Sequence, residues 1–172
     1  MIYIFSAFYA EAKNIIDHYG LKKEKSPEMV RFDVFANDSI RLVITGVGEI
    51  NAAAAVSNIG GAYGISPDDE ILNVGCGAGF SSDICLGSIF LGNKLTEQMT
   101  GRTFYPDMLM NANFRECEIV TVARVLNEGC DSVVYDMEAA AVYQVAAFFV
   151  GPHRMHFIKP VSYTHLRAHE TG

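Results

Sequence analysis

The spacing of hydrophobic and polar positions predicts a strand, a helix and a pair of strands in the first part of the chain. Residues 2–5 are a short apolar run of a kind that favours strands. In residues 9–19, apolar positions recur three and four residues apart, which is the spacing of one helix face. Residues 31–36 and 40–45 predict two paired strands, because the segment 37–39 between them is typical of a turn.

The rest of the chain continues this alternation, with one irregular stretch. Further strands are expected at residues 70–74, 87–91, 118–125, 133–135 and 156–159. Alanine-rich helices are expected at 50–60 and 137–149, whereas 100–116 is expected to be a loop. Strands that alternate with helices favour a largely parallel sheet that is covered on both faces. We therefore predict an α/β fold with three layers, α/β/α, around a central, mostly parallel mixed sheet.

Composition and charge restrict the class of partner. With 172 residues, 50% of them hydrophobic, the chain can form one domain with a buried sheet. A net charge of −7 argues against a nucleic-acid surface, because binding phosphate backbones requires clustered Lys and Arg. No run is long enough to span a membrane, and the N-terminal segment lacks the basic start of a secretory signal. The expected partner is a small polar metabolite, not a nucleic acid or a membrane.

The cysteines and histidines predict neither a disulfide framework nor a metal site. The cysteines show no CxxC pairing; they are Cys76, Cys85, Cys117 and Cys130. His153 with His156, and His165 with His169, have spacings that a metal could use, but no carboxylate or cysteine completes either set. We expect no metal and a reducing, cytoplasmic location.

Candidate chemistry lies where the predicted strands end. Ligands of open α/β sheets bind beyond the carboxyl ends of the strands, where the segments 6–11, 75–80 and 135–138 lie. The glycines of Gly46-x-Gly48 and Gly75-x-Gly77-x-Gly79 could cradle a phosphate, or could serve tight turns and close packing. Asn51 stands where a dinucleotide fingerprint beginning at Gly46 would need its third glycine, so a Rossmann cofactor site is not expected.

Three carboxylates stand in apolar surroundings. Glu11 lies among alanines and Phe8, while Asp136 and Glu138 separate two apolar runs. One interpretation is structural: Glu11 complements the dipole of a helix first turn, and Asp136 caps the next helix. The other is catalytic, because one carboxylate can orient water while another holds the sugar hydroxyls during cleavage of a glycosidic bond. The residues by themselves leave both interpretations open.

Taken in order, four motifs resemble the methylthioadenosine/S-adenosylhomocysteine nucleosidases of the nucleoside phosphorylase and nucleosidase superfamily. They are Ala7-Phe8-x-x-Glu11, Thr45-Gly46-Val47-Gly48 followed by Asn51-Ala52-Ala53, Asn73-Val74-Gly75-Cys76-Gly77-Ala78-Gly79, and Asp136-Met137-Glu138-Ala139. The similarity covers roughly residues 1–159, and the Met-Glu-Ala element is its most specific part. It implies a sheet of the nucleoside phosphorylase type.

The resemblance also implies an activity: cofactor-free hydrolysis of the N-glycosidic bond of a purine nucleoside or 5′-thionucleoside, in a homodimer. Glu11 is the expected catalytic residue, which activates the attacking water. The residues expected to frame the base are Cys76, Gly77, Ala78, Gly79 and Phe80. In the ribose site the resemblance places Asp136, Met137 under the sugar, and Glu138 on the 2′ and 3′ hydroxyls.

Two features bear on the reaction and on the base. Phosphorolytic relatives hold phosphate with arginines in the N-terminal turn and just before the third-strand glycine. Here residues 6–12 contain no basic residue and no arginine directly precedes Gly75. Hydrolysis is therefore favoured, with a phosphorylase or a non-catalytic nucleoside-binding domain as alternatives. The aromatic residue that would stack on the base is not defined, and Phe80 and Phe104 are the candidates.

The C-terminal segment departs from the family pattern. Tyr163 stands where the family has an aspartate that protonates the departing purine, and a tyrosine with a pKa near 10 is a poor acid. Pro160 interrupts an expected central strand, and the segment from 161 on is similar to a tail found at the ends of unrelated sequences. We expect a domain of residues 1–159, an anomalous tail of residues 160–172 in place of the last helix, and an impaired hydrolase.

Overall fold

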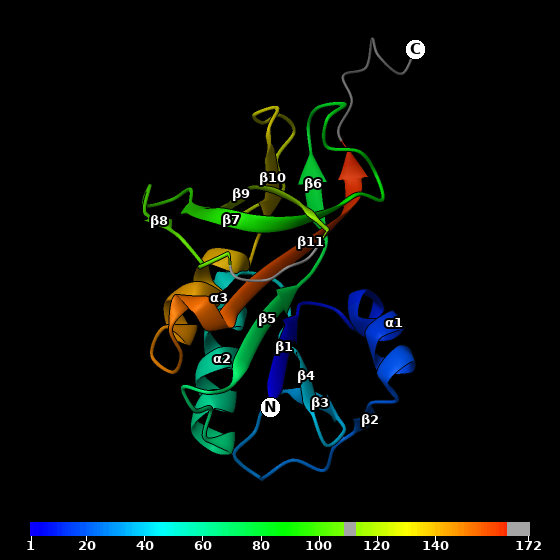
Figure 1. Cartoon of the computed structure of the whole chain (residues 1–172), viewed down its shortest axis with the longest axis vertical. Helices are drawn as coiled ribbons and strands as arrows, with labels where there is room; N and C mark the ends of the chain where they lie inside the picture. Colours follow the sequence, from blue (N-terminus) through cyan, green and yellow to red (C-terminus); the bar gives the residue numbers. More distant parts are fainter. Residues whose placement is uncertain (109–112, 165–172) are drawn as a thin grey trace.

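The computed structural model describes residues 1–108 and 113–164, with side chains through Ser162. Within these residues one mixed sheet has the strand order β2-β3-β4-β1-β5-β11-β6-β10-β9-β7-β8 (Figure 1). Its strands are β1 (Ile2–Ser6), β2 (Lys22–Lys23), β3 (Asp33–Ala36), β4 (Ile40–Ile44), β5 (Glu70–Val74), β6 (Gly77–Gly79), β7 (Ile89–Glu97), β8 (Thr103–Phe104), β9 (Arg115–Thr121), β10 (Val133–Asp136) and β11 (Met155–Thr164). The helices are α1 (Tyr9–Tyr19), α2 (Glu49–Tyr63), α3 (Ala139–Ala146) and the short 3-10 helix η1 (Pro152–Arg154).

The helices cover both faces of the open part of the sheet, with α1 on one side and α2 and α3 on the other (Figure 1). In β1, Tyr3 and Phe5 pack into the core beneath α2 and α3, whereas Ile4 packs with Ala12 and Ile16 of α1. Successive side chains of a strand point to opposite faces, so a strand buried on both faces is apolar at every position. The predicted α/β class with three layers is confirmed.

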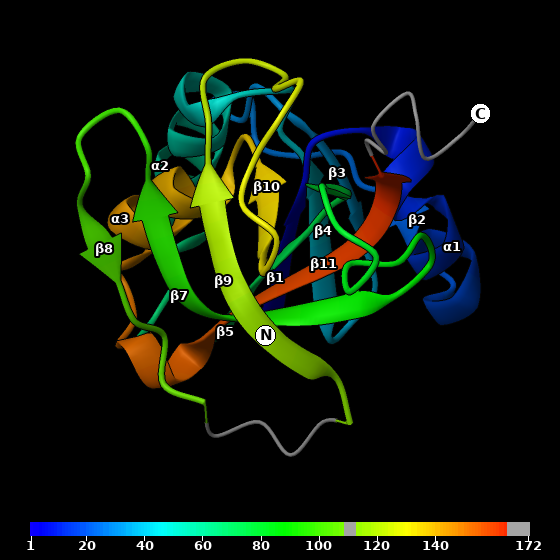
Figure 2. The same cartoon turned by 90° about the horizontal axis from the view of Figure 1, so that it is seen from above.

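One part of the sheet closes on itself, which the order of predicted strands did not indicate. Strand β11 pairs with both β6 and β7, and the pairings β6–β10, β10–β9 and β9–β7 complete a ring. Figure 2 shows β7, β9 and β10 side by side in this ring. The open sheet and the ring share β11, which leaves β5 after Ile158 and joins β6 at Val161.

Strand β11 continues through Pro160 to Thr164, beyond the expected strand at 156–159. The N–H of Val161 donates to the carbonyl oxygen of Ser88 at 2.8 Å, on the β7 side. The nitrogen of Pro160 therefore faces the other side, where the neighbouring strand changes from β5 to β6. Pro160, which has no N–H, therefore lies between the β11–β5 and β11–β6 ladders. The expected domain boundary after residue 159 falls inside β11. Residues 165–172 of the expected tail lie outside the described residues.

The third helix begins two residues later than predicted, because the backbone of Glu138 is not helical, with φ −132° and ψ −32°. The Asp136 carboxylate accepts the backbone N–H groups of Glu138 at 3.3 Å and Ala139 at 2.7 Å. These bonds satisfy two backbone N–H groups at the start of the helix, whose N-cap residue is Glu138 and whose first residue is Ala139. The expected helix over 137–149 is correct in type and too long at both ends.

The strands of the ring have other limits than those predicted. Strand β7 runs past residue 91 to Glu97. Its register with β9 is irregular after Gly92, which breaks the alternation by which a strand is recognised in a sequence, so the predicted strand ended too early. Strand β9 ends at Thr121, where the sequence pattern suggested 125. The expected loop 100–116 contains β8 and the start of β9, and its residues 109–112 lie outside the described part of the chain.

Candidate active site

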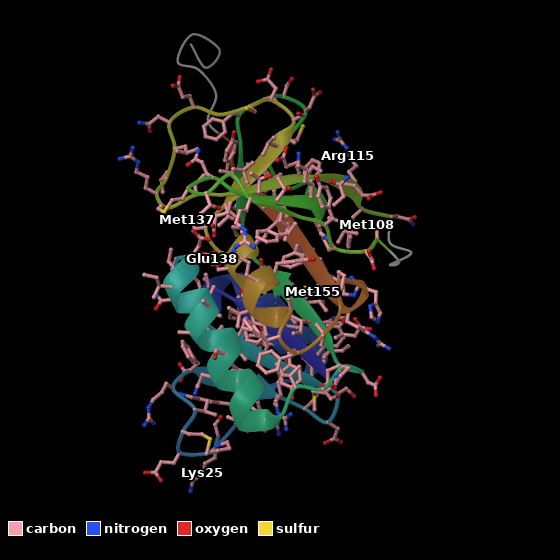
Figure 3. All side chains as sticks on the ribbon, turned by 90° about the vertical axis from the view of Figure 1, so that its left-hand side faces the viewer. Lys25, Met108, Arg115, Met137, Glu138 and Met155 are labelled. Atoms are coloured by element: carbon pink, nitrogen blue, oxygen red, sulfur yellow. The ribbon has the colours of Figure 1, made fainter. Side chains whose placement is uncertain are left out.

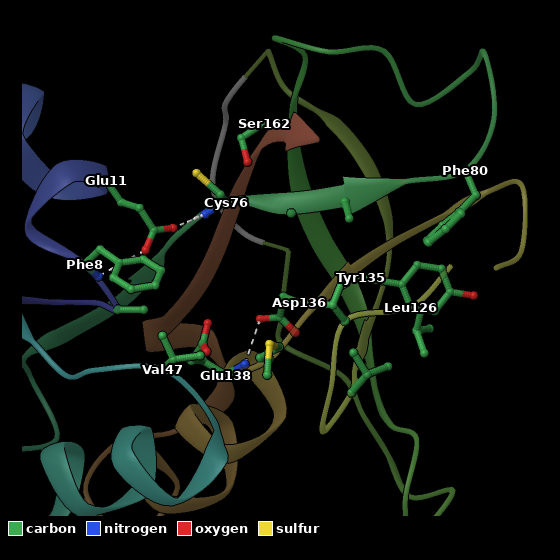
Figure 4. A pocket seen from close by; sticks show the side chains of 16 residues that line it. Phe8, Glu11, Val47, Cys76, Phe80, Leu126, Tyr135, Asp136, Glu138 and Ser162 are labelled. Carbon is green, nitrogen blue, oxygen red and sulfur yellow. Dashed lines mark hydrogen bonds between the residues drawn. The ribbon is translucent and has the colours of Figure 1, made fainter. Parts of the chain in front are cut away.

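A cavity of about 350 Å³ lies where the open sheet meets the ring, which is a typical size for a small-ligand site. It is lined by Ala7, Phe8, Glu11, Val47, Cys76, Gly77, Ala78, Phe80, Val122, Val125, Leu126, Tyr135, Asp136, Met137, Glu138 and Ser162. Figure 4 shows the carboxylates of Glu11 and Glu138 on one side and the rings of Phe80 and Tyr135 on the other. The cavity thus has a polar end and an apolar end.

Glu11 joins the start of α1 to the glycine-rich segment after β5. Its Oε1 accepts the backbone N–H of Phe8 at 3.1 Å, and its Oε2 accepts the backbone N–H of Cys76. The first contact stabilises the beginning of the helix, as the structural interpretation requires. The second positions the carboxylate on the cavity, so the two interpretations of Glu11 are compatible.

Glu138 is held by the turn that precedes α2. Its Oε2 accepts the backbone N–H of Gly48 at 2.8 Å, and Gly48 has a φ of 95°, which favours glycine. Figure 3 shows Glu138 at the N-terminal end of α2, with Met137 beside it. Burial raises the pKa of Glu138; the Gly48 N–H opposes this, and the nearby Asp136 carboxylate adds to it. Burial thus favours the neutral form of Glu138 more than it would be favoured in an exposed glutamate.

Asp136 lies at the end of β10 and is surrounded by donors. Its Oδ1 accepts the hydroxyl of Thr121 at 2.6 Å, and its Oδ2 lies 2.9 Å from Nζ of Lys159. Lys159 is fully buried and also donates to Oδ1 of Asn73 at 2.6 Å. An ion pair thus underlies the polar end of the cavity. Neither Lys159 nor Asn73 was predicted to be a site residue, although a single lysine in the apolar run of β11 is a signal that could have indicated Lys159.

The two glycine segments do not form open phosphate cradles. Gly48 N–H is used by Glu138 and Cys76 N–H by Glu11, so carboxylates of the chain occupy these donors. A Cβ on Gly77 would lie 2.3 Å from Cγ1 of Val134, and one on Gly79 would lie 2.2 Å from Cγ2 of Ile84. Close packing of β6 therefore explains these two glycines, which is the structural alternative for this segment.

The apolar end is built mainly by residues that the sequence analysis did not single out. The ring of Tyr135 meets the ring of Phe80 edge to face, with centroids 5.3 Å apart. Val122, Val125 and Leu126 complete this end from the loop that follows β9. Phe104, the other candidate for stacking on a base, packs against Tyr143 instead and does not line the cavity.

Most of the predicted site residues meet in this cavity. Its lining contains Glu11, Cys76, Gly77, Ala78, Phe80, Asp136, Met137 and Glu138, whereas Gly79 is buried outside it. Burial raises the pKa of the Cys76 thiol, with Ser162 opposing and Glu11 adding to the effect. No cluster of three or more His, Cys, Asp or Glu that could hold a metal occurs among the described residues. None of the described helices is long and apolar enough to cross a membrane.

Comparison with known proteins relates this fold to nucleosidases. No protein-family model and no curated protein matches the sequence. Among solved structures, an MTA/SAH nucleosidase is 21% identical, with a TM-score of 0.76 over 95% of this chain and 81% of that one. The 5′-methylthioadenosine/S-adenosylhomocysteine nucleosidase of Neisseria meningitidis, in complex with methylthio-immucillin-A, is 17% identical, with a TM-score of 0.74 over 95% and 87%.

A third structure, a futalosine hydrolase mutant of Helicobacter pylori, is 14% identical, with a TM-score of 0.76 over 94% of this chain and 88% of that one. At these identities the likeness establishes the fold. The expected sheet of the nucleoside phosphorylase and nucleosidase type is therefore confirmed.

Proposed function

Because the chain has the fold of the MTA/SAH nucleosidases, we propose that it is an N-ribosyl hydrolase that acts on a purine nucleoside or 5′-thionucleoside. One observation carries this proposal. Glu11 and Glu138 are fixed on one cavity by the backbone N–H groups of Cys76 and Gly48, and the other end of that cavity is apolar. Such a site suits a ligand with a sugar at one end and an aromatic base at the other.

The carboxylates match the charge that develops during this reaction. Water adds to the anomeric carbon, the C–N bond breaks, and its electron pair leaves with the base, so the sugar passes through a cation-like state. Glu11 accepts the proton of the attacking water, while Glu138 binds the 2′ and 3′ hydroxyls and Met137 lies under the ribose. Lys159 neutralises Asp136, and the two glutamates remain to stabilise the positive charge of the sugar.

Hydrolysis fits the site better than phosphorolysis does. Among the residues of the described part of the chain that line the cavity, none is Lys, Arg or His. A phosphate nucleophile would therefore meet two carboxylates without a cation to hold it. Water carries no charge and needs only the acceptor oxygen that Glu11 provides.

A second candidate function is nucleoside binding without turnover, and Tyr163 is the observation that favours it. The departing base needs a proton, and Tyr163 stands where the related enzymes have an aspartate. The backbone of Tyr163 pairs with Ala78 in the β11–β6 ladder, at the level of the cavity, while its side chain lies outside the described part of the chain. Turnover much slower than binding is therefore expected.

A homodimer is the proposed assembly. Phe8, Val47 and Val125 line the cavity and still expose 52%, 38% and 77% of their surface, and the adjacent Ile50 exposes 86%. A second copy that covers these side chains would close the mouth of the cavity. All four cysteines are free thiols, which supports a reducing cytoplasm as the location. Light scattering of the purified chain tests the assembly, and a monomeric mass would contradict it.

A product assay separates the proposed functions. The protein is incubated with 5′-methylthioadenosine or adenosine, with and without phosphate, and base and sugar products are separated by chromatography. Hydrolysis releases free base and unphosphorylated sugar at a rate that phosphate does not change. Ribose 1-phosphate would identify a phosphorylase, and calorimetric binding without base release would identify a binding domain. Neither binding nor release would refute the site assignment.

A further inference from the structure

The apolar end of the cavity is organised around Tyr135, a residue of β10 that is 8% exposed. Its ring belongs to a cluster with Val122 and Leu126, and Phe80 meets it at an interplanar angle of 87°. Each of these neighbours also lines the cavity. Tyr135 is thus the shared contact of the side chains that form this end.

The hydroxyl of Tyr135 has a separate role: it attaches the loop between β9 and β10. It accepts the backbone N–H of Cys130 at 2.8 Å. Gly129 approaches the same rings so closely that a Cβ there would lie 2.5 Å from Cε2 of Tyr135 and 2.8 Å from Cδ2 of Phe80. Ser81 supplies a second tether, because its hydroxyl donates to the carbonyl oxygen of Asp131. The C-terminal half of the loop therefore packs against the rings of Phe80 and Tyr135.

The same loop carries Val125 and Leu126 into the cavity. Residues 123–132 are otherwise largely exposed, so few packing contacts hold them in place. The positions of the Val125 and Leu126 side chains therefore depend on the attachment of the loop to Tyr135. Loss of the attachment would change the width of the apolar end and would leave the carboxylate end unaltered, since Glu11 and Glu138 are held by other elements.

We propose that Tyr135 is a specificity-determining residue of the nucleoside site. Its ring, and the hydrogen bond by which it attaches the loop 123–132, shape the apolar end of the cavity for a flat aromatic base. This inference rests on the proposed function. The recognised group is an uncharged planar ring, because the described side chains that line this end are apolar or aromatic. The base is bound by contact area and stacking, and the sugar by carboxylates.

Two substitutions separate the two tasks of Tyr135. Tyr135→Phe keeps the ring and removes the acceptor for Cys130 N–H, whereas Tyr135→Leu also removes the ring. Tyr105→Phe is the matched control, because Tyr105 is 58% exposed and does not line the cavity. Calorimetry measures the affinity for a C-nucleoside analogue of adenosine, which cannot be hydrolysed, and for a base-free iminoribitol. Amide hydrogen exchange at Gly129 and Cys130 reports the attachment of the loop.

For Tyr135→Phe we expect faster exchange at Cys130 and about a fivefold loss of affinity for the C-nucleoside, as the loss of one hydrogen bond implies. For Tyr135→Leu we expect a loss of more than about tenfold, because a stacking surface is also removed. Affinity for the iminoribitol is expected to stay unchanged in both variants and in Tyr105→Phe.

Two results would overturn the inference while the proposed function stands. One is unchanged affinity for the C-nucleoside in both Tyr135 variants; the other is an equal loss for both ligands, which would mark a general structural role. If the unaltered protein binds neither ligand, the proposed function fails and this inference fails with it.

Discussion

Nζ of Lys159 lies 2.9 Å from Oδ2 of Asp136, and neither side chain is exposed to solvent. The ion pair joins the end of β10 to the middle of β11, at the point where the ring of strands meets the open sheet. Asn73 and Thr121 satisfy the remaining polar atoms around it. A buried pair with such partners holds the floor of the cavity in one arrangement, although the desolvation of both charges limits its net contribution to stability.

Removal of one partner should be costly. In Lys159→Met the Asp136 carboxylate stays buried without its counter-ion, so we expect the free energy of unfolding to fall by about 3–5 kcal/mol. The double variant Lys159→Met/Asp136→Asn removes both charges and should recover part of that loss. Urea denaturation of the single variants and the double variant measures the coupling. Strictly additive losses would show that the two side chains do not stabilise each other.

Glu138 should be required for ligand binding and not for folding. The carboxylate in Glu138→Gln is replaced by a neutral amide, so charged hydrogen bonds to the sugar hydroxyls are lost, and nucleoside affinity should fall about ten- to a hundredfold. Glu28→Gln, at an exposed glutamate away from the cavity, is the matched control. Calorimetry with a non-hydrolysable nucleoside and thermal unfolding are measured on both. An affinity that Glu138→Gln leaves intact would exclude this residue from the site.

The glycines of β6 should tolerate no side chain. In Gly77→Ala the new Cβ would stand 2.3 Å from Cγ1 of Val134 and would force the two strands apart, at a cost of about 1–3 kcal/mol. Gly61→Ala in α2 provides the contrast, because no atom lies within 4 Å of its Cβ position apart from its chain neighbours and the backbone of its own helix. There the helix should gain roughly 0.5–1 kcal/mol. Thermal denaturation of both variants compares the two, and equal effects would disprove the packing role of Gly77.

Stability should decrease between mildly acidic and neutral pH because of Glu49. Burial, and then a hydrogen bond with Glu97, raise the pKa of Glu49 to about 7. From pH 4.5 to 7 the unfolded chain therefore carries an ionised Glu49 and the folded chain a largely neutral one, so this stabilising contribution is lost as pH rises. The pKa of Glu97 is lowered, so its opposite contribution changes only below this window.

Glu49→Gln isolates that effect, since the amide keeps a donor for Glu97 and does not titrate. The variant should lose about 1 kcal/mol less stability than the unaltered protein between pH 5 and 8, a difference reduced by solvent screening. Glu28→Gln should retain the original slope. Unfolding by urea at several pH values measures the slopes, and identical slopes in the three proteins would contradict the raised pKa of Glu49.

The local pattern predicted the open sheet well and the ring poorly. The helix over 9–19 and the strand over 70–74 agree with α1 and β5 residue by residue, because their apolar spacing is undisturbed and turn residues flank them. In the ring, β6 consists of glycine and alanine, and beside the ring β8 has two residues, so neither has a recognisable periodicity. Their strand conformation comes from pairing with β10, β11 and β7.

Near neighbours in the chain were enough to specify the parts of the site. A carboxylate in a first helical turn, glycines after a strand and an acidic residue before an alanine-rich helix are local features, so Glu11, Gly48 and Asp136 could be recognised from residues within a few positions of each. The pattern also contained the fold class, because alternating strands and helices have few ways to bury their apolar faces.

The arrangement of those parts depends on contacts between distant residues. Glu11 meets Cys76 across 65 positions, Asn73 meets Lys159 across 86, and Gly48 meets Glu138 across 90. No periodicity spans such distances, because the partners belong to separate elements that come together only when the strands pair in the folded sheet. The partners of the lysine beneath the cavity and the aromatic wall around Tyr135 therefore became visible in the folded chain alone.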